Sequence, residues 1–211
     1  MIGTIDLIQI LLIAVPVIIA ITFHEAAHGF VALRFGDTTA RDRGRLTLNP
    51  LKHIDPIGTV LIPVILLLAH TGFIFGYAKP VPVNARALRN PKRDMILVAA
   101  AGPVTNLILA ALSGALFYVF DATNISSLAS NAMQASITVN LILAIFNLLP
   151  IPPLDGSKIV GGLLPDNLAR PYLRLGRFGL IPVLIFLIAL PFIVATLGYG
   201  FHSITHILNS K

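Results

Sequence analysis

The sequence predicts an all-α polytopic membrane protein, with about four full transmembrane helices and one re-entrant segment made of a helix and a β-hairpin. Of its 211 residues, 56% are hydrophobic and 11% are charged, and the mean hydropathy is +0.87. Five apolar segments are each near or above the length that crosses a bilayer. They cover residues 7–33, 57–75, 95–120, 132–149 and 178–197. No separate soluble domain fits between them, so we expect a single integral-membrane domain over residues 1–211.

The composition also excludes several classes of chemistry. There is no cysteine, so disulfides, thiol catalysis and thiolate metal ligands are excluded, and His, Asp and Glu are the strong candidate ligands. The net charge is +6, but the basic residues lie in loops next to apolar segments. This placement indicates membrane topology and contact with anionic lipid of the bilayer, and does not favour a nucleic-acid partner.

The basic residues also predict the orientation of the chain. Lys and Arg gather in residues 34–52, 79–93 and 158–177, whereas residues 121–131 contain none. Under the positive-inside rule the three basic loops face the cytoplasm. We therefore expect the functional site to lie toward the cytoplasmic side of the membrane. The expected location is the inner membrane of a prokaryotic cell, with the chain as an integral membrane protein.

The first apolar segment contains the chain's most informative motif. From residue 7 to residue 33 the only charged side chain is Glu25, within the string HEAAH. On a helix His24 and His28 are separated by about 400°, so they share one face and can bind one ion. This is the HExxH geometry of zinc peptidases, in which Glu25 would act as general base. A transport or packing role for the three residues is the alternative, because ionisable groups within the membrane are also typical of transporters.

The second apolar segment, 57–75, has basic loops on both sides, so a single crossing would place one loop on the wrong side of the membrane. A re-entrant excursion resolves this conflict: a helix enters and residues 71–83 return in extended form. Pro80 and Pro82 suit an edge strand there, since proline cannot donate to a central ladder. We also expect a strand or extended loop at residues 45–48 and a short interfacial helix at 84–90.

Two polar residues outside the motif have competing interpretations. Asn106 lies within the apolar segment 95–120, and an interhelical hydrogen bond is favoured over a direct role in the site. His53 lies in a basic turn, and a surface or capping residue is favoured over a metal ligand.

The second motif follows the segment 132–149 and reads NLLPIPPLDGSK. Its prolines break the helix, and Asp155 is either the N-cap of a helix that starts near Ser157 or a third metal ligand at the depth of His28. A second i, i+4 pair, His202 and His206, could form another metal site, but an exposed amphipathic tail is favoured.

These motifs together resemble the site-2 protease family of intramembrane zinc metalloproteases, in its short form. The strings that match are spread over residues 24–156, which is most of the chain, and the first and the last string are the most specific. They are HEAAH at 24–28, GRLTLNPLKHIDPIG at 44–58, GYAKPVPVN at 76–84, AGPVTN at 101–106 and NLLPIPPLDG at 147–156.

The resemblance implies one zinc ion per chain, held by His24, His28 and Asp155. It also implies that Glu25 activates the attacking water and that Asn147 helps to hold the substrate carbonyl or its oxyanion. The family cuts transmembrane segments of membrane-protein substrates in regulated intramembrane proteolysis. The larger members have a PDZ or CBS domain, for which we expect no room in this chain.

Two other classes of function compete with the protease. A metal-ion or proton transporter would also use His and Glu within the membrane. It would need a second charged station along its path, whereas the motifs predict a single closed cluster. A non-proteolytic binding protein on the same scaffold would have lost the glutamate or a ligand, and all of these residues are present. The sequence therefore favours the enzyme.

Overall fold

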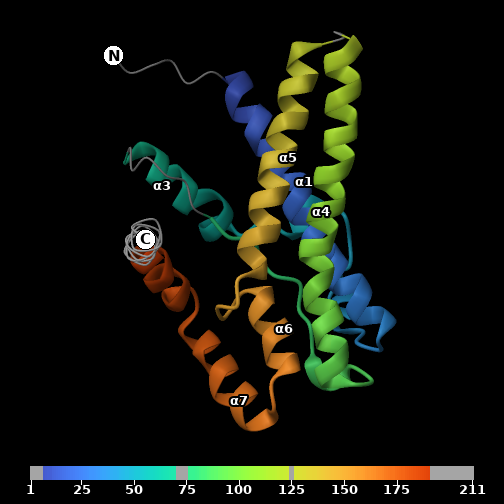
Figure 1. The fold of residues 1–211 in the computed structure, drawn as a ribbon, viewed down its shortest axis with the longest axis vertical. Helices are drawn as coiled ribbons and strands as arrows, with labels where there is room; N and C mark the ends of the chain where they lie inside the picture. The colour runs from blue at the N-terminus through green and yellow to red at the C-terminus, as the bar shows by residue number, and fades with distance from the viewer. Residues whose placement is uncertain (1–6, 70–75, 124–125, 191–211) are drawn as a thin grey trace, which may run out of the picture.

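The computed structural model describes residues 7–69, 76–123 and 126–190, and all structural statements below concern these residues. Three of their helices are long and apolar enough to cross a membrane: α1 (Leu7–Arg34), α4 (Pro91–Thr123) and α5 (Ser127–Leu148). In Figure 1, α4 and α5 stand side by side and α1 crosses them at a slant. The prediction of a helical membrane protein is confirmed.

The three long helices bury little of their apolar surface within the protein. Only 28%, 33% and 11% of the most apolar windows of α1, α4 and α5 are buried. Each of the three helices has Leu or Ile side chains that are more than half exposed, such as Ile13, Leu112 and Ile145. In water such a surface would be unfavourable, so these faces are built to contact lipid.

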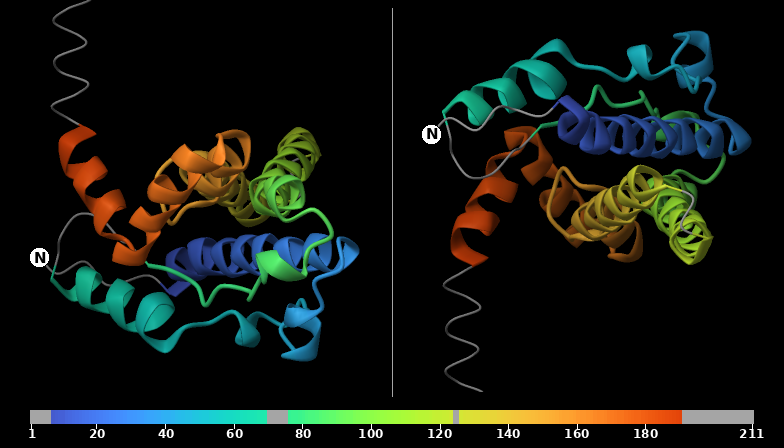
Figure 2. Two further views of the ribbon diagram at one scale, coloured as in Figure 1. Left: turned by 90° about the horizontal axis from the view of Figure 1, so that it is seen from below. Right: turned by 90° about the horizontal axis from the view of Figure 1, so that it is seen from above.

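Small residues let the helices approach one another. Ala20 and Ala32 of α1 are fully buried, and so are Ala144 of α5 and, to 1% exposure, Ala99 of α4. Close approach permits tight van der Waals packing. In a membrane this packing, and not the hydrophobic effect, holds helices together. Figure 2 shows that α1 lies between α3 on one side and the pair α4 and α5 on the other.

The ends of these helices follow local sequence signals. Helix α1 ends at Arg34, and the turn after it contains Gly36, whose φ of 104° is strained for residues with a Cβ. The Gly36 N–H donates to the Leu33 carbonyl. Helix α4 begins at a proline, and the Asp94 carboxylate accepts from the Asn90 N–H before it. Helix α5 begins after Ser126, whose hydroxyl accepts from the Ala129 N–H.

The segment after α1 leaves the bundle, and its residues 77–79 return to residues 53–58. It contains α2 (Thr39–Asp42), a 3-10 turn (Pro50–Lys52), a π-helical stretch (Pro56–Leu61) and α3 (Ile62–Leu68). The returning chain bonds to the place where the excursion began: Tyr77 N–H donates to Gly58 O (3.0 Å), and Lys79 N–H donates to His53 O (3.0 Å). The Tyr77 ring lies 2.4 Å from where a Cβ on Gly58 would be. Both ends thus lie together, as a re-entrant segment requires.

The β-structure that we expected in this region is not formed among the described residues. Of the expected return at 71–83, residues 71–75 lie outside the described residues, and residues 76–83 are extended but pair with no strand. Residues 45–46 are irregular and 47–48 form bends, and the predicted helix at 84–90 is a single 3-10 turn, Ala85–Ala87. Side chains take the backbone groups that a ladder would use. Arg45 Nη2 donates to the Lys79 carbonyl (2.9 Å), and Val81 N–H donates to the Glu25 carboxylate. Two prolines in the segment have no N–H to offer.

After α5 the chain continues alongside the lower part of α4 (Figure 1). Helix α6 (Asp155–Leu163) packs against α4, and α7 (Asp166–Arg174) follows after a short turn, then a 3-10 turn (Leu175–Phe178). A further helix, Ile181–Leu190, makes an angle of 91° with the stretch Asp166–Phe178. The bend lies at Gly179, which has a φ of 58°. Of the predicted last span, residues 191–197 lie outside the described residues.

Candidate metal centre

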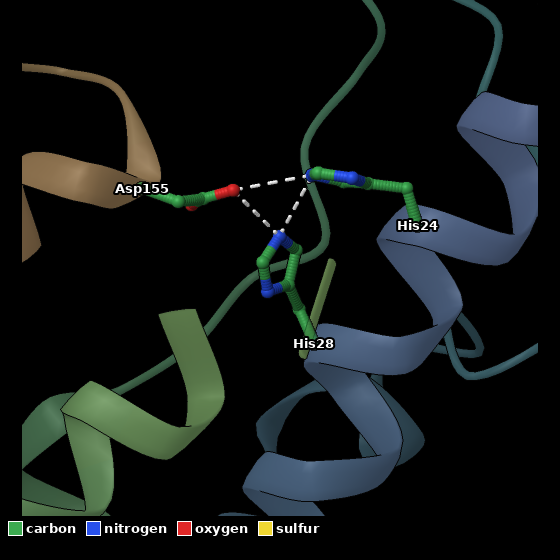
Figure 3. Close-up of side chains that lie close together, drawn as sticks. All are labelled: His24, His28 and Asp155. Atoms are coloured by element: carbon green, nitrogen blue, oxygen red, sulfur yellow. Dashed lines mark hydrogen bonds and ion pairs between the residues drawn. The ribbon is translucent and has the colours of Figure 1, made fainter. Parts of the chain in front are cut away.

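Side chains from two distant parts of the sequence converge in a buried cluster. His24 and His28 of α1 face Asp155 of α6, as Figure 3 shows. The two Nε2 atoms are 3.0 Å apart, and Asp155 Oδ2 lies 3.2 Å from His24 Nε2 and 3.1 Å from His28 Nε2. All three residues are buried, with exposures of 6%, 7% and 4%. The structure thus joins the two motifs as the sequence predicted.

Helix α4 holds both imidazoles by their other nitrogen. His28 Nδ1–H donates to the Val98 carbonyl at 2.7 Å, and His24 Nδ1 is hydrogen-bonded to Asn106 Oδ1. Each ring therefore directs Nε2 toward the cluster. Partners of this kind on the second nitrogen fix the orientation of metal-binding histidines. The interhelical hydrogen bond predicted for Asn106 is confirmed, and its partner is a residue of the site.

Asp155 is the first residue of α6, and Leu154 occupies the N-cap position. The capping interpretation of Asp155 is therefore wrong. Its Oδ2 faces the imidazoles, while Oδ1 accepts a hydrogen bond from Lys158 Nζ at 2.9 Å. Burial alone would raise the pKa of the Asp155 carboxyl. Hydrogen bonds with His24 and His28 and the nearby Lys158 ammonium outweigh it and hold this pKa well below its usual range.

Gly102 lets α4 approach the two imidazoles. A Cβ at this position would lie 2.5 Å from Nε2 of both His24 and His28. A residue with a Cβ does not fit here unless a ring moves. Glycine at this position therefore leaves room for the two Nε2 atoms to lie next to each other.

The donor set fits a zinc ion. Ligand atoms at about 2.0–2.1 Å from a tetrahedral zinc lie about 3.3 Å apart, close to the spacings of 3.0–3.2 Å in the cluster. Two imidazoles and one carboxylate are three protein ligands, the number found in catalytic zinc sites, where a fourth position stays open. The structure thus contains a buried cluster that could hold a metal ion.

Glu25 lies beside the cluster and is half-buried. Its Oε2 accepts a hydrogen bond from the Val81 N–H at 2.7 Å, so the extended segment 76–83 is bonded directly to this carboxylate. Arg45 holds the same segment from the other side through the carbonyls of Lys79 and Pro80, at 2.9 and 3.3 Å. The contact with Val81 could not be predicted from either motif, because it joins two distant segments.

A cavity of about 1250 Å³ opens onto the cluster. His24, Glu25, His28 and Asp155 all line it, and so does Asn147. The Asn147 Nδ2 donates to the Leu143 carbonyl of its own helix at 3.0 Å. The residue therefore faces the cavity without a bond to the cluster, in a position from which a bound molecule could be reached.

The remaining histidines are separate from the cluster or not described. His53 is buried, with 2% exposure, so the surface interpretation is wrong, but it caps the 3-10 turn Pro50–Lys52. Its Nε2–H donates to the Thr47 carbonyl at 2.9 Å. His202 and His206 lie outside the described residues.

Sequence reasoning missed three contributors to the site. Lys158 was visible three residues after Asp155, a spacing that places both on one helix face. Asn140 was visible as a buried amide in an apolar segment, and it donates to Ser136 O and accepts from Asn106. Gly102 is the third, and nothing in the sequence indicates which side chain lies opposite it.

Comparison with known proteins gives a consistent result. The model of the family described as Peptidase family M50 matches residues 114–190. The chain is 41% identical over 179 residues to "Putative zinc metalloprotease YwhC" of Bacillus subtilis, an alignment that covers 82% of the chain and 78% of the relative. It is 32% identical to "Putative zinc metalloprotease Rip2" of Mycolicibacterium smegmatis, over 81% of the chain and 64% of that relative. No solved structure matches the chain.

Proposed function

Since the chain belongs to peptidase family M50, the zinc metalloproteases of the site-2 protease type, we propose that it hydrolyses peptide bonds in the transmembrane segments of membrane-protein substrates. The observation that supports this most directly is the buried cluster of His24, His28 and Asp155, which opens onto a cavity among membrane helices. A buried group of ionisable residues at membrane depth is costly, and its usual reason is function.

We assign the zinc ion to His24 Nε2, His28 Nε2 and Asp155 Oδ2. When bound, zinc would polarise a peptide carbonyl and lower the pKa of the water that attacks it. Lys158 binds the second carboxylate oxygen, Oδ1, and so keeps Oδ2 directed at the ion.

We assign the role of general base to Glu25. It follows His24 on α1 and lines the same cavity. Its carboxylate can therefore take the proton that the attacking water must lose. The hydrogen bond from the Val81 N–H occupies only Oε2 of Glu25, so we assign to Oε1 the role of accepting the proton from the attacking water. Asn147, which also lines the cavity, would donate its amide to the substrate carbonyl and to the oxyanion that develops on it.

The substrate would bind in extended form along residues 76–83. A transmembrane helix uses its carbonyls in its own hydrogen bonds, so the scissile bond has to leave the helix before it is cut. The extended segment lies at the cavity and pairs with no strand among the described residues. A substrate strand would add through the backbone groups that Arg45 and Glu25 do not engage. We further propose that the site faces the cytoplasmic side of a prokaryotic inner membrane and acts in regulated proteolysis.

This function is tested with purified protein and transmembrane substrates that differ only in helix stability. We expect substrates with Gly or Pro near the scissile bond to be cleaved faster than a rigid Leu-rich version, because Gly and Pro disfavour a helix by about 1 and 3 kcal/mol. A chelator should stop all cleavage, and zinc should restore it. Equal rates for rigid and destabilised substrates would contradict the requirement for an extended substrate.

A further inference from the structure

Two buried asparagines lie behind His24, between α4 and α5. Asn106 of α4 is fully buried and Asn140 of α5 is 1% exposed. Asn106 Nδ2 donates to Asn140 Oδ1 at 2.8 Å and to the Ala20 carbonyl at 3.3 Å, and its Oδ1 faces His24 Nδ1. Helix association alone would not require an amide at this place, so the network calls for a specific account.

Metal binding places a condition on each histidine. Its Nε2 must be unprotonated, so Nδ1 must have the proton and needs an acceptor. For His28 the partner is the Val98 carbonyl, which can only accept, so the backbone fixes the tautomer. For His24 the partner is an amide, which can present either an oxygen or an NH₂ group. The tautomer of His24 therefore depends on how the Asn106 amide is turned.

Asn140 determines that orientation. If the Asn106 amide were reversed, its oxygen would face the Ala20 carbonyl and Asn140 Oδ1, two acceptors with no proton between them. Asn140 is itself held, because its Nδ2 donates to the Ser136 carbonyl at 2.9 Å. Its reversal would also bring two oxygens together. Each of the two amides thus has one favourable orientation. Together these orientations place the Asn106 oxygen, a hydrogen-bond acceptor, at His24 Nδ1.

We propose that Asn106 and Asn140 are positioning residues, which together fix the ring orientation and tautomer of His24 so that its Nε2 lone pair is directed at the metal. The inference rests on the ligand set proposed above. It gives the two asparagines different tasks: Asn106 provides the acceptor, and Asn140 keeps the acceptor turned the right way.

The first test compares two nearly isosteric changes at one position. In the full chain in lipid nanodiscs, zinc affinity is measured by competition with a chelator. Asn106→Leu removes the acceptor, and we expect it to weaken zinc binding by about 10- to 100-fold, as loss of such partners does elsewhere. Asn106→Asp keeps an acceptor at His24 whichever way it turns, and we expect zinc affinity within about threefold of wild type. Its second oxygen faces the Ala20 carbonyl and Asn140 Oδ1 in place of a donor, so we expect this variant to lose thermal stability while it keeps zinc affinity. If Asn106 served only in helix packing, both variants would change in thermal stability but keep the zinc affinity of wild type.

The second test isolates Asn140. In the wild-type background we expect Asn140→Leu to weaken zinc binding by about tenfold, because the Asn106 amide is then free to reverse. In the Asn106→Asp background the same change should have no effect, since a carboxylate has no wrong orientation. Ser113→Ala is the matched control: it removes the 2.8 Å bond to Ser136 between the same two helices and should leave zinc affinity within twofold.

The outcomes separate this inference from the ligand assignment. If wild type and all variants bind no zinc, the proposed ligand set fails and the inference fails with it. If wild type binds zinc and Asn106→Leu binds it equally well, or Leu and Asp weaken it equally, only the positioning role is overturned. Should Asn106→Leu fail to fold, the dependence of Asn140→Leu on the residue at 106 decides between the same two results.

Discussion

Replacement of Glu25 by glutamine is expected to lower the rate of peptide hydrolysis by about 10²- to 10⁴-fold while zinc stays bound. The amide cannot accept a proton from the attacking water, but it leaves His24, His28 and Asp155 unchanged. Its oxygen can still accept the hydrogen bond that Val81 N–H donates in wild type at 2.7 Å. The segment 76–83 should therefore keep its place, and the loss should be confined to the chemical step.

The measurement pairs the cleavage rate of a helix-destabilised transmembrane substrate with zinc content on the same preparation. Activity within tenfold of wild type would show that Glu25 is not the general base. Loss of zinc together with activity would show instead that the carboxylate supports the metal site.

A single methyl group at Gly102 is expected to remove zinc and activity together. The added Cβ of Gly102→Ala would lie 2.5 Å from Nε2 of His24 and of His28, so at least one ring must move from the cluster. The neighbouring atoms are rings held at Nδ1 by α4 itself, so they cannot move without loss of those bonds. We expect a fall in zinc affinity of at least about 100-fold, the upper end of the effect of lost supporting partners.

Gly114 provides the matched control for this change. It lies on the same helix, and nothing lies within 4 Å of where its Cβ would be. Gly114→Ala should keep zinc and activity, and alanine is the better helix former. Equal behaviour of the two variants would contradict the close approach of α4 to the imidazoles.

The sequence was sufficient for the membrane fold and for the convergence of the three candidate ligands. Apolar length predicted α1, α4 and α5 to within a few residues, because a bilayer imposes that length. The i, i+4 spacing placed His24 and His28 on one face, and counting of crossings placed Asp155 at their depth. The helix lengths and the shared face rest on periodicity and on the membrane, which act on each segment separately. The choice of Asp155 as a ligand, in place of an N-cap, rested on the family resemblance.

Features that depend on two distant segments were beyond the reach of such reasoning. The return expected at residues 71–83 is extended but unpaired over its described part, 76–83, because Arg45 and Glu25 take its backbone groups. The prolines at 80 and 82 were consistent with an edge strand and equally with an unpaired extended segment. Likewise, the bond from Asn106 to His24 was predicted as an interhelical contact but without its partner, since an amide in an apolar helix does not indicate what it faces.

The zinc content of two variants tests the ligand assignment most directly. Wild type should bind one zinc per chain, Asp155→Ala should bind none, and the double variant His202→Ala, His206→Ala should bind zinc and cleave substrate as wild type does. A ligand must lie about 2 Å from the ion, and Asp155 Oδ2 already lies within 3.2 Å of both imidazole nitrogens. Full zinc occupancy in Asp155→Ala, with loss of zinc in the double histidine variant, would contradict the assignment.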